Sequence, residues 1–179
     1  MKNFLFATTL LCFLFAACEN KNTPAPATAF DEKKEQEAIM ATIRQETECF
    51  YKGDYECWKQ AYAQTDYSFQ AWTLPDSTVD AKTGWKAVDE KIGKYIRENP
   101  APAGGSNYPK VERRNMVVKF YCESVAWMSW DQYNFSNKRQ VWQYSKETRV
   151  MEKMGGQWKI VSVAAFWDYK NMIAADSLK

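Results

Sequence analysis

Glu147 and Arg149 are the two residues of this chain whose types and spacing could do chemistry. They lie two positions apart in a segment, Gln140 to Lys153, whose pattern is typical of a strand, so their side chains share one face of it. One interpretation is a structural ion pair. The other is a site in which Arg149 holds an anionic or carbonyl group while Glu147 orients it, or acts as a base if burial raises its pKa. Both stay open.

The chain of 179 residues contains no histidine, which excludes most familiar hydrolase chemistry. Histidine general bases, Ser-His-Asp triads and Cys-His nucleophiles cannot form, and the commonest protein ligand of zinc or copper is missing. We therefore expect neither a metal nor a cofactor.

Five cysteines are present, and Cys12 and Cys18 belong to the N-terminal segment discussed below. The other three are Cys49, Cys57 and Cys122, and no CxxC spacing suggests zinc binding or thiol exchange. Cys49 could pair with Cys57 in an oxidising compartment, but small buried thiols are the interpretation that we favour.

Overall composition predicts one ordinary globular domain, with a formal charge of +2, 46% hydrophobic residues and 26% charged residues. A disordered chain would have fewer apolar residues, and a nucleic-acid-binding protein would be far more basic. We expect no nucleic-acid partner.

The first 17 residues are typical of an export signal, with Lys2 ahead of an apolar run. Phe4 to Ala17 would span only about 21 Å as a helix, too short for a permanent membrane span of about 30 Å. Small residues before Cys18 resemble the lipobox of bacterial lipoproteins, although Phe15 stands where leucine is usual. The resemblance implies lipidation of Cys18 and a lipid-anchored place in the cell envelope of a Gram-negative bacterium, in the outer membrane or facing the periplasm. A plain secretory signal is the alternative.

Residues 18–29 are polar and rich in Pro and Ala, so we expect a disordered tether ahead of a domain at 30–170 and a tail at 171–179. The domain begins with an amphipathic pattern from Asp31 to Lys52. Gly53 is expected to stop this helix, and Asp54 to cap a short second one. A strand is predicted over 67–72.

A third helix, capped by Thr83, is predicted to end before Pro100. Its apolar stripe is expected in the core, as is that of the second helix, and the stripe residues include Trp58, Trp85 and Tyr95. The period then changes to two, which predicts an antiparallel, curved sheet of long strands. The four long strands are Lys110 to Cys122, Val125 to Tyr133, Gln140 to Lys153 and Gln157 to Asp168.

A turn at Gly155-Gly156 would align the last two strands. The predicted pairs are Met154 with Gln157, Glu152 with Lys159, Val150 with Val161, and Arg149 with Ser162. One face then holds Glu147, Arg149, Met151, Trp158, Ile160, Ser162, Ala164 and Phe166. The other holds Trp142, Tyr144, Thr148, Val150, Val161, Val163 and Trp167. Both are too apolar for solvent.

These segments together resemble the nuclear transport factor 2-like superfamily over residues 31–169, and within it the SnoaL-like branch found in exported bacterial proteins. The segments that carry the resemblance are GDYECW at 53–58, GWKAVDEKI at 84–92, SVAWMSWDQYN at 124–134 and ETRVMEKMGGQWKIV at 147–161. It implies an α+β fold shaped as a cone, with three N-terminal helices packed on a curved antiparallel sheet. It also implies a pocket inside the cone and dimers that form through the outer sheet face.

On that fold, the face with Glu147 and Arg149 is expected to line the pocket, and the more uniformly apolar face to meet a second copy. Enzymes of the superfamily have histidines near the end of the last strand. The corresponding positions of this chain are occupied by Ser162 and Ala164. A copied catalytic set is therefore absent, which favours binding without chemistry. If any residue is catalytic, it is Glu147.

Eight tryptophans suggest stacking on a flat ligand. Trp72, Trp127 and Trp130 are candidates for the pocket rim, and Trp130 is expected to face inward with Ala126 and Met128. The predicted ligand-binding residues are Trp72, Trp130, Glu147, Arg149, Ser162 and Phe166. Three functions stay open, namely a lipid-anchored protein that binds a small molecule, a dimeric assembly module, and an isomerase, cyclase or dehydratase.

Overall fold

A long helix, α1 (Glu32–Lys52), opens the part of the chain that the structure describes, residues 29–101 and 109–178 of a computed structural model. The Asp31 side chain accepts a hydrogen bond from the backbone N–H of Lys34, and Gly53 ends the helix at φ 67°, as the sequence predicts. Cys18, the expected signal segment and most of the tether lie outside the described residues.

Helix α2 (Tyr55–Gln60) follows at once, capped by Asp54 as predicted. A disulfide joins Cys49 of α1 to Cys57 of α2, with their Cα atoms 5.7 Å apart. The preference for free thiols at these positions was therefore wrong, because the Gly53 turn folds the two helices back until the side chains meet. Cys122 is free and exposed.

Two short strands, β1 (Phe69–Thr73) and β2 (Val79–Thr83), pair antiparallel as a hairpin. β1 matches the predicted strand, but β2 was not predicted. Thr83 ends β2 instead of capping a helix, and Gly84 precedes the next helix. β2 alternates exposed and half-buried residues and lies at the edge of the sheet, so it carries no hydrophobic pattern.

The third helical stretch consists of α3 (Trp85–Val88), a π-helical turn (Asp89–Gly93) and α4 (Lys94–Glu98). Val88 and Ile96 are buried as the stripe predicts. Tyr95 is 53% exposed and stacks on Phe50, which corrects its expected place in the core. The wider π turn is the reason, because it rotates the following residues relative to an α-helical stripe.

The absence of a side chain at Gly93 leaves room for the Asp89 carboxylate, which lies against this position of the π turn. Asp89 Oδ1 accepts hydrogen bonds from Tyr55 Oη at 2.7 Å and Arg97 Nη1 at 3.1 Å. A Cβ atom at position 93 would lie 2.9 Å from Tyr55 Cε2 and closer still to the Asp89 carboxylate.

We expect Gly93→Ala to lower the free energy of unfolding by about 1–2 kcal/mol, because it displaces Asp89 from hydrogen bonds to two partners. Denaturant unfolding of the two proteins measures the difference. Ala87→Gly, elsewhere in the same stretch, lowers helix propensity without placing any atom against Asp89 and serves as the control. A Gly93→Ala protein as stable as the parent would show that this packing is not tight.

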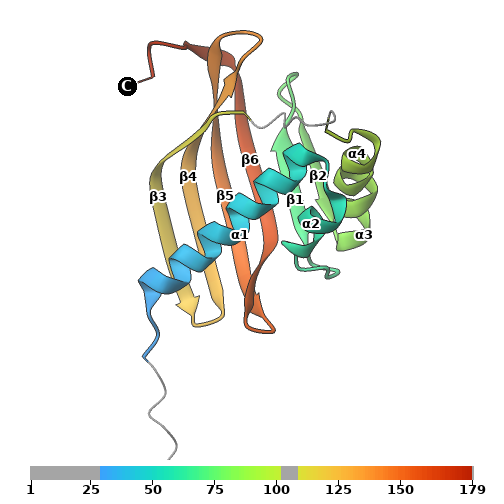
Figure 1. Ribbon diagram of the computed structural model, residues 1–179, viewed down its shortest axis with the longest axis vertical. Helices are drawn as coiled ribbons and strands as arrows, with labels where there is room; N and C mark the ends of the chain where they lie inside the picture. Colours follow the sequence, from blue (N-terminus) through green and yellow to red (C-terminus); the bar gives the residue numbers. More distant parts are fainter. Residues whose placement is uncertain (1–28, 102–108, 179) are drawn as a thin grey trace, which may run out of the picture.

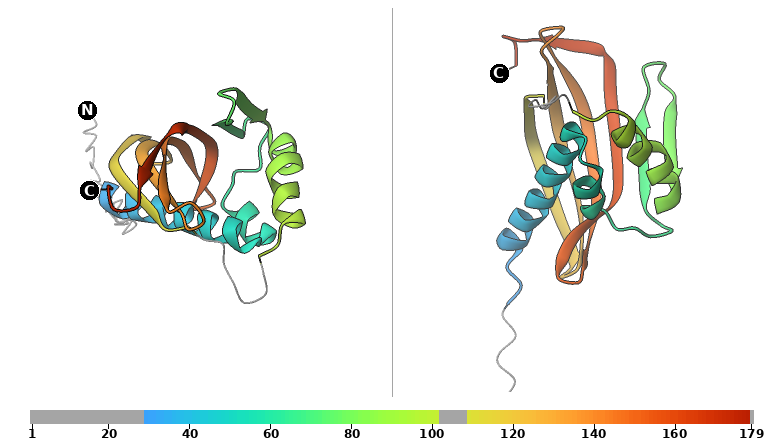
Figure 2. Two further views of the ribbon diagram at one scale, coloured as in Figure 1. Left: turned by 90° about the horizontal axis from the view of Figure 1, so that it is seen from above. Right: turned by 45° about the vertical axis from the view of Figure 1, so that its right-hand side comes forward.

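The sheet has six strands in the order β2-β1-β6-β5-β4-β3. Its long strands are β3 (Val111–Cys122), β4 (Val125–Ser136), β5 (Val141–Met154) and β6 (Gln157–Ala174). All neighbours are antiparallel except β1 and β6. The sheet curves strongly, α1 crosses its concave face, and the other helices lie beside β1 and β2 (Figures 1 and 2). The predicted α+β architecture is confirmed.

The β5–β6 hairpin corrects the predicted register halfway along. Met154 pairs with Gln157 and Glu152 with Lys159, as predicted, but a bulge then shifts β6 by one residue. Val150 faces Ser162 and Arg149 faces Val163, where the sequence predicted Val161 and Ser162. Since directly paired residues share a face, the residues of β6 from Ser162 to Trp167 change sides relative to the prediction.

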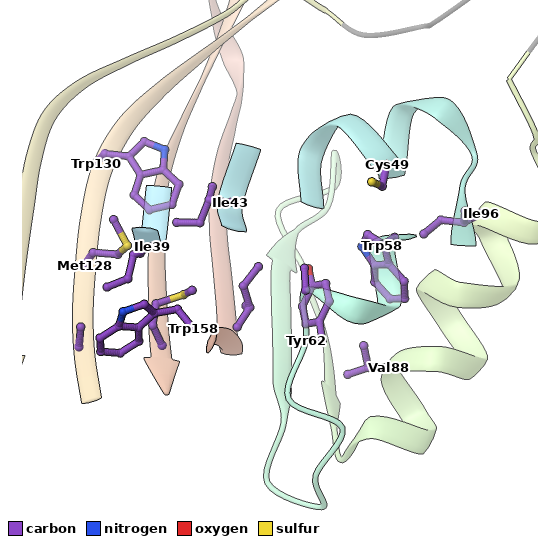
Figure 3. Close-up of a cluster of buried hydrophobic side chains, with 14 residues drawn as sticks. Ile39, Ile43, Cys49, Trp58, Tyr62, Val88, Ile96, Met128, Trp130 and Trp158 are labelled. Atoms are coloured by element: carbon purple, nitrogen blue, oxygen red, sulfur yellow. The ribbon is translucent and has the colours of Figure 1, made fainter. Parts of the chain in front are cut away.

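The core fills the space between α1 and the concave face and continues beside α2 (Figure 3). Ile39 and Ile43 of α1 are buried with Met128, Trp130 and other residues of the sheet. A second group lies against α2 and the third helical stretch, where Trp58 and Tyr62 meet Val88 and Ile96. The predicted core role of Trp58 is confirmed, and Trp85 is partly buried against the same group.

Candidate functional site

Glu147 and Arg149 point to the concave side of β5, as their spacing predicts. Arg149 Nη1 donates to Glu147 Oε2 at 2.8 Å, and Ser145 Oγ donates to Glu147 Oε1 at 2.8 Å. Only 2% of Glu147 and 8% of Arg149 is exposed. Both carboxylate oxygens thus already accept hydrogen bonds from this chain, and the residues form a buried ion pair.

Arg149 keeps its charge at this depth. Burial opposes the charge, but the carboxylates of Glu147 and Glu46 outweigh that effect and hold the pKa of Arg149 above its ordinary value. Nη1 also donates to the Thr148 carbonyl oxygen at 2.9 Å. The Arg149 Nε–H, in contrast, is buried and has no hydrogen-bond partner. Such a group is uncommon in a folded protein, because it costs free energy until an acceptor reaches it.

Trp130 lies beside this pair. It is fully buried and directly opposite Glu147 in the β4–β5 ladder, and Ala126 and Met128 on the same face of β4 are equally buried, so their inward direction is confirmed. The Arg149 guanidinium sits 5.0 Å from the Trp130 ring centroid, within the range of a cation–π interaction. Trp130 therefore contacts the cation as well as the core.

Polar side chains continue along the same face beyond Trp130 and Glu147. On β4 they are Gln132 and Asn134, and opposite them on β5 stand Ser145 and Gln143. Trp130 Nε1 donates to Gln132 Oε1 at 3.2 Å. Arg113 of β3, which pairs with Gln132, donates to the same oxygen through Nε at 3.1 Å. The polar track consists of Arg113, Trp130, Gln132, Asn134, Gln143, Ser145, Glu147 and Arg149.

Sequence reasoning found three members of the polar track and missed the neutral ones and Arg113. The signal that could have found them is the period of two itself. Gln132 and Asn134 have the same parity as Trp130, and Gln143 and Ser145 have that of Glu147.

The structure places the other predicted ligand-binding residues differently. Trp72 of β1 faces Ala165, which faces Glu147, so Trp72 occupies the same row of the concave side. Ser162 and Phe166 do not, since the bulge in β6 pairs them with Val150 and Lys146 on the outer face. Phe166 is 52% exposed there. Their expected place beside Glu147 and Arg149 was wrong.

The bulge also breaks up the predicted apolar outer face. Val163 and Trp167 pair with Arg149 and Ser145, which puts them on the concave side, and Val161 is buried at the bulge. Trp127 stays on the outer face, opposite Val150. The outer face is thus less apolar than the sequence indicated.

A second polar group lies between α1 and α2, close to Arg149. Glu46 Oε1 accepts hydrogen bonds from Trp58 Nε1 at 3.1 Å and from Tyr62 Oη at 2.8 Å. Burial, followed by the neighbouring Glu46 charge, raises the pKa of Tyr62 well above its ordinary value, so the phenol stays neutral. With Arg113, Arg149, Glu46 and Glu147, this part of the cone holds two cations and two carboxylates.

Surface cavities lie elsewhere. Two of them, of about 590 and 680 Å³, adjoin the start of α1 and the β5–β6 turn and share Lys34, Glu35, Lys153 and Gly156. Neither is lined by Glu147 or Arg149. Within the described ranges, no three cysteine, aspartate or glutamate side chains are placed to hold a metal ion. No helix in that part of the chain is long and apolar enough to cross a membrane.

Comparison with solved structures shows that this is the nuclear transport factor 2-like fold. A nuclear transport factor 2-like protein of unknown function from Shewanella oneidensis superposes with a TM-score of 0.56 and 16% identity, covering 74% of this chain and 98% of its own. The association domain of CaMKII from Caenorhabditis elegans gives 0.56 and 18%, covering 75% and 96%. A candidate scytalone dehydratase from Novosphingobium aromaticivorans gives 0.53 and 14%, covering 76% and 85%. No protein-family model and no curated protein matches the chain.

Proposed function

We propose that the concave face of this fold binds a small molecule along the polar track, with the Arg149 Nε–H as a fixed donor. The observation that carries the proposal is that this N–H is buried and has no acceptor. The cost of an unsatisfied buried donor is about 1–3 kcal/mol, and a ligand that brings an acceptor oxygen recovers it. Arg149 is rigidly held by Glu147 and Thr148, so the donor is pre-organised.

The test removes the ion pair as a unit. Glu147→Leu with Arg149→Met keeps the volume of the site and leaves no buried charge behind. Thermal unfolding in the presence of a panel of small carbonyl- and hydroxyl-bearing compounds identifies those that stabilise the parent protein. The same compounds should stabilise Lys119→Met, which loses an exposed cation of β3, and should not stabilise the double variant. Compounds that stabilise all three proteins would contradict a role for Arg149.

We also propose that the outer sheet face meets a second copy of this chain. Val117, Tyr121 and Phe166 are large apolar residues that are 52–70% exposed, and a row of small residues crosses the face from Ser129 to Ala164. Exposed apolar side chains that gather on one face are typical of a surface that meets another protein. Ala164→Arg should shift a dimer to monomer in light scattering at micromolar concentration, whereas Val79→Arg, at the edge strand, should not. A parent protein that is strictly monomeric would rule this out.

Export with a lipid anchor on Cys18 is a further proposal. The Cys49–Cys57 disulfide supports an oxidising compartment, and the signal pattern of residues 1–17 supports export. Cys18→Ser is expected to move the mature protein from the membrane fraction to the soluble fraction. Unchanged fractionation would leave only the plain secretory signal.

A further inference from the structure

Asn134 and Gln143 form a directly opposed pair at the end of the polar track. Asn134 lies on β4 and Gln143 on β5, and they are register partners. Asn134 Nδ2 and Gln143 Nε2 are buried and have no hydrogen-bond partner. Among the buried side-chain nitrogen and oxygen atoms of the described ranges, these two and Arg149 Nε are the ones without a partner. All three are donors.

A chain of hydrogen bonds that starts from groups able only to donate determines which end of the Asn134 amide is the oxygen and which is the nitrogen. Arg113 Nε and Trp130 Nε1 both donate to Gln132 Oε1, which leaves the Gln132 amide nitrogen to donate onward. Gln132 Nε2 donates to Asn134 Oδ1 at 3.3 Å. Turning the Asn134 amide over would put two NH₂ groups face to face, so its free group is an N–H donor.

A single hydrogen bond, from the exposed Arg139 guanidinium, orients the Gln143 amide. Arg139 Nη2 donates to Gln143 Oε1 at 3.4 Å, so the nitrogen of this amide is also the group left over. Opposed residues on antiparallel strands have Cβ atoms roughly 5 Å apart, so both amides can reach one ligand group. Met172 of β6 pairs with Gln143 and has a flexible side chain that can move aside.

We propose that the Asn134–Gln143 pair is a subsite for a carboxylate, or another planar oxyanion, of the bound small molecule. This inference rests on the proposed function. Two adjacent N–H donors match the two oxygens of a carboxylate. The Arg139 guanidinium donates to Gln143 directly, and the Arg113 guanidinium donates to Gln132, which in turn donates to Asn134. Gln143 and Arg149 are six positions apart on β5, a distance of roughly 20 Å, so the subsite is separate from the ion pair.

Sodium benzoate and neutral benzamide are suitable probes for nuclear magnetic resonance of the ¹⁵N-labelled mature chain. Benzoate should shift the side-chain amide signals of Asn134 and Gln143, and benzamide should shift them far less. Equal shifts with benzamide, or no shift with millimolar benzoate, would overturn the assignment. The Arg149 Nε–H signal reports the other site, so benzoate that shifts only this signal supports the proposed function and removes the subsite.

Two variants sharpen the test. Asn134→Asp keeps the acceptor for Gln132 and replaces the free donor with an oxygen, so benzoate should bind at least roughly tenfold more weakly. Asn137→Asp, in the exposed turn beyond β4, adds the same charge and should bind benzoate as the parent does. Gln143→Met removes a donor that has no partner in the free protein, so stability should be unchanged or higher while benzoate binding falls. Stability that falls with binding unchanged would mean a structural role and contradict the proposal.

Discussion

Replacing Arg149 with methionine is expected to lower the free energy of unfolding by about 3–5 kcal/mol. The substitution leaves the Glu147 carboxylate 98% buried with only the Ser145 hydroxyl as a partner. It also removes the nearer of the two guanidiniums that lie over the Trp130 ring. Urea unfolding followed by circular dichroism measures the loss, and Lys119→Met, which removes an exposed cation, should stay within about 0.5 kcal/mol of the parent.

The double variant with Glu147→Leu separates the cost of an unpaired charge from the value of the pair itself. Well-packed apolar residues often replace a buried ion pair at little cost or with a gain. We therefore expect the double variant to recover most of the stability that Arg149→Met loses. A double variant as unstable as the single one would show that the pair stabilises the fold in its own right, and would favour the structural ion pair over a binding role.

Faces of β4 and β5 could be predicted from the sequence because their alternation is unbroken. Trp130 of β4 and both Glu147 and Arg149 of β5 stand on the predicted side, and Trp130 faces Glu147 in the ladder. A period of two needs only local information, since each side chain follows from the pleat. Where no bulge intervened, the pattern placed the site correctly.

The bulge in β6 could not be predicted, and it moved two of the six proposed ligand-binding residues. Residues 160–167 are apolar or small at both parities, so a slip of one residue leaves no trace in the pattern. Ser162 and Phe166 were lost to the outer face for this reason. β2 could not be predicted either, because it lies at the edge of the sheet and carries Asp80 and Lys82. The π turn could not be predicted because it has no hydrophobic period of its own.

The neutral members of the polar track were overlooked for a chemical reason. Glutamine, asparagine and serine are common on solvated strands, and a sequence does not show which of their atoms lack partners. Only the chain of hydrogen bonds from Arg113 and Trp130 to Asn134 fixes which group of the amide is free. That information comes from the geometry, and it is what allows the chemistry of the ligand to be inferred.

Reduction of the Cys49–Cys57 disulfide is expected to lower the free energy of unfolding by about 2–3 kcal/mol. The bond closes a loop with a sequence separation of 8, and in the chain-entropy model opening so short a loop releases this amount to the unfolded state. Guanidinium unfolding with and without dithiothreitol measures this difference in the free energy of unfolding without any change of sequence.

Cys122→Ser provides the control for that experiment, because Cys122 is free and exposed and its loss should leave the response to dithiothreitol unchanged. The disulfide also holds the corner between α1 and α2, which carry Glu46 and Trp58. If it orders the corner, reduction should also expose Trp58 and change its fluorescence, since its indole N–H is held by Glu46 across the corner. Stability within about 0.5 kcal/mol after full reduction would mean that core packing alone fixes the corner.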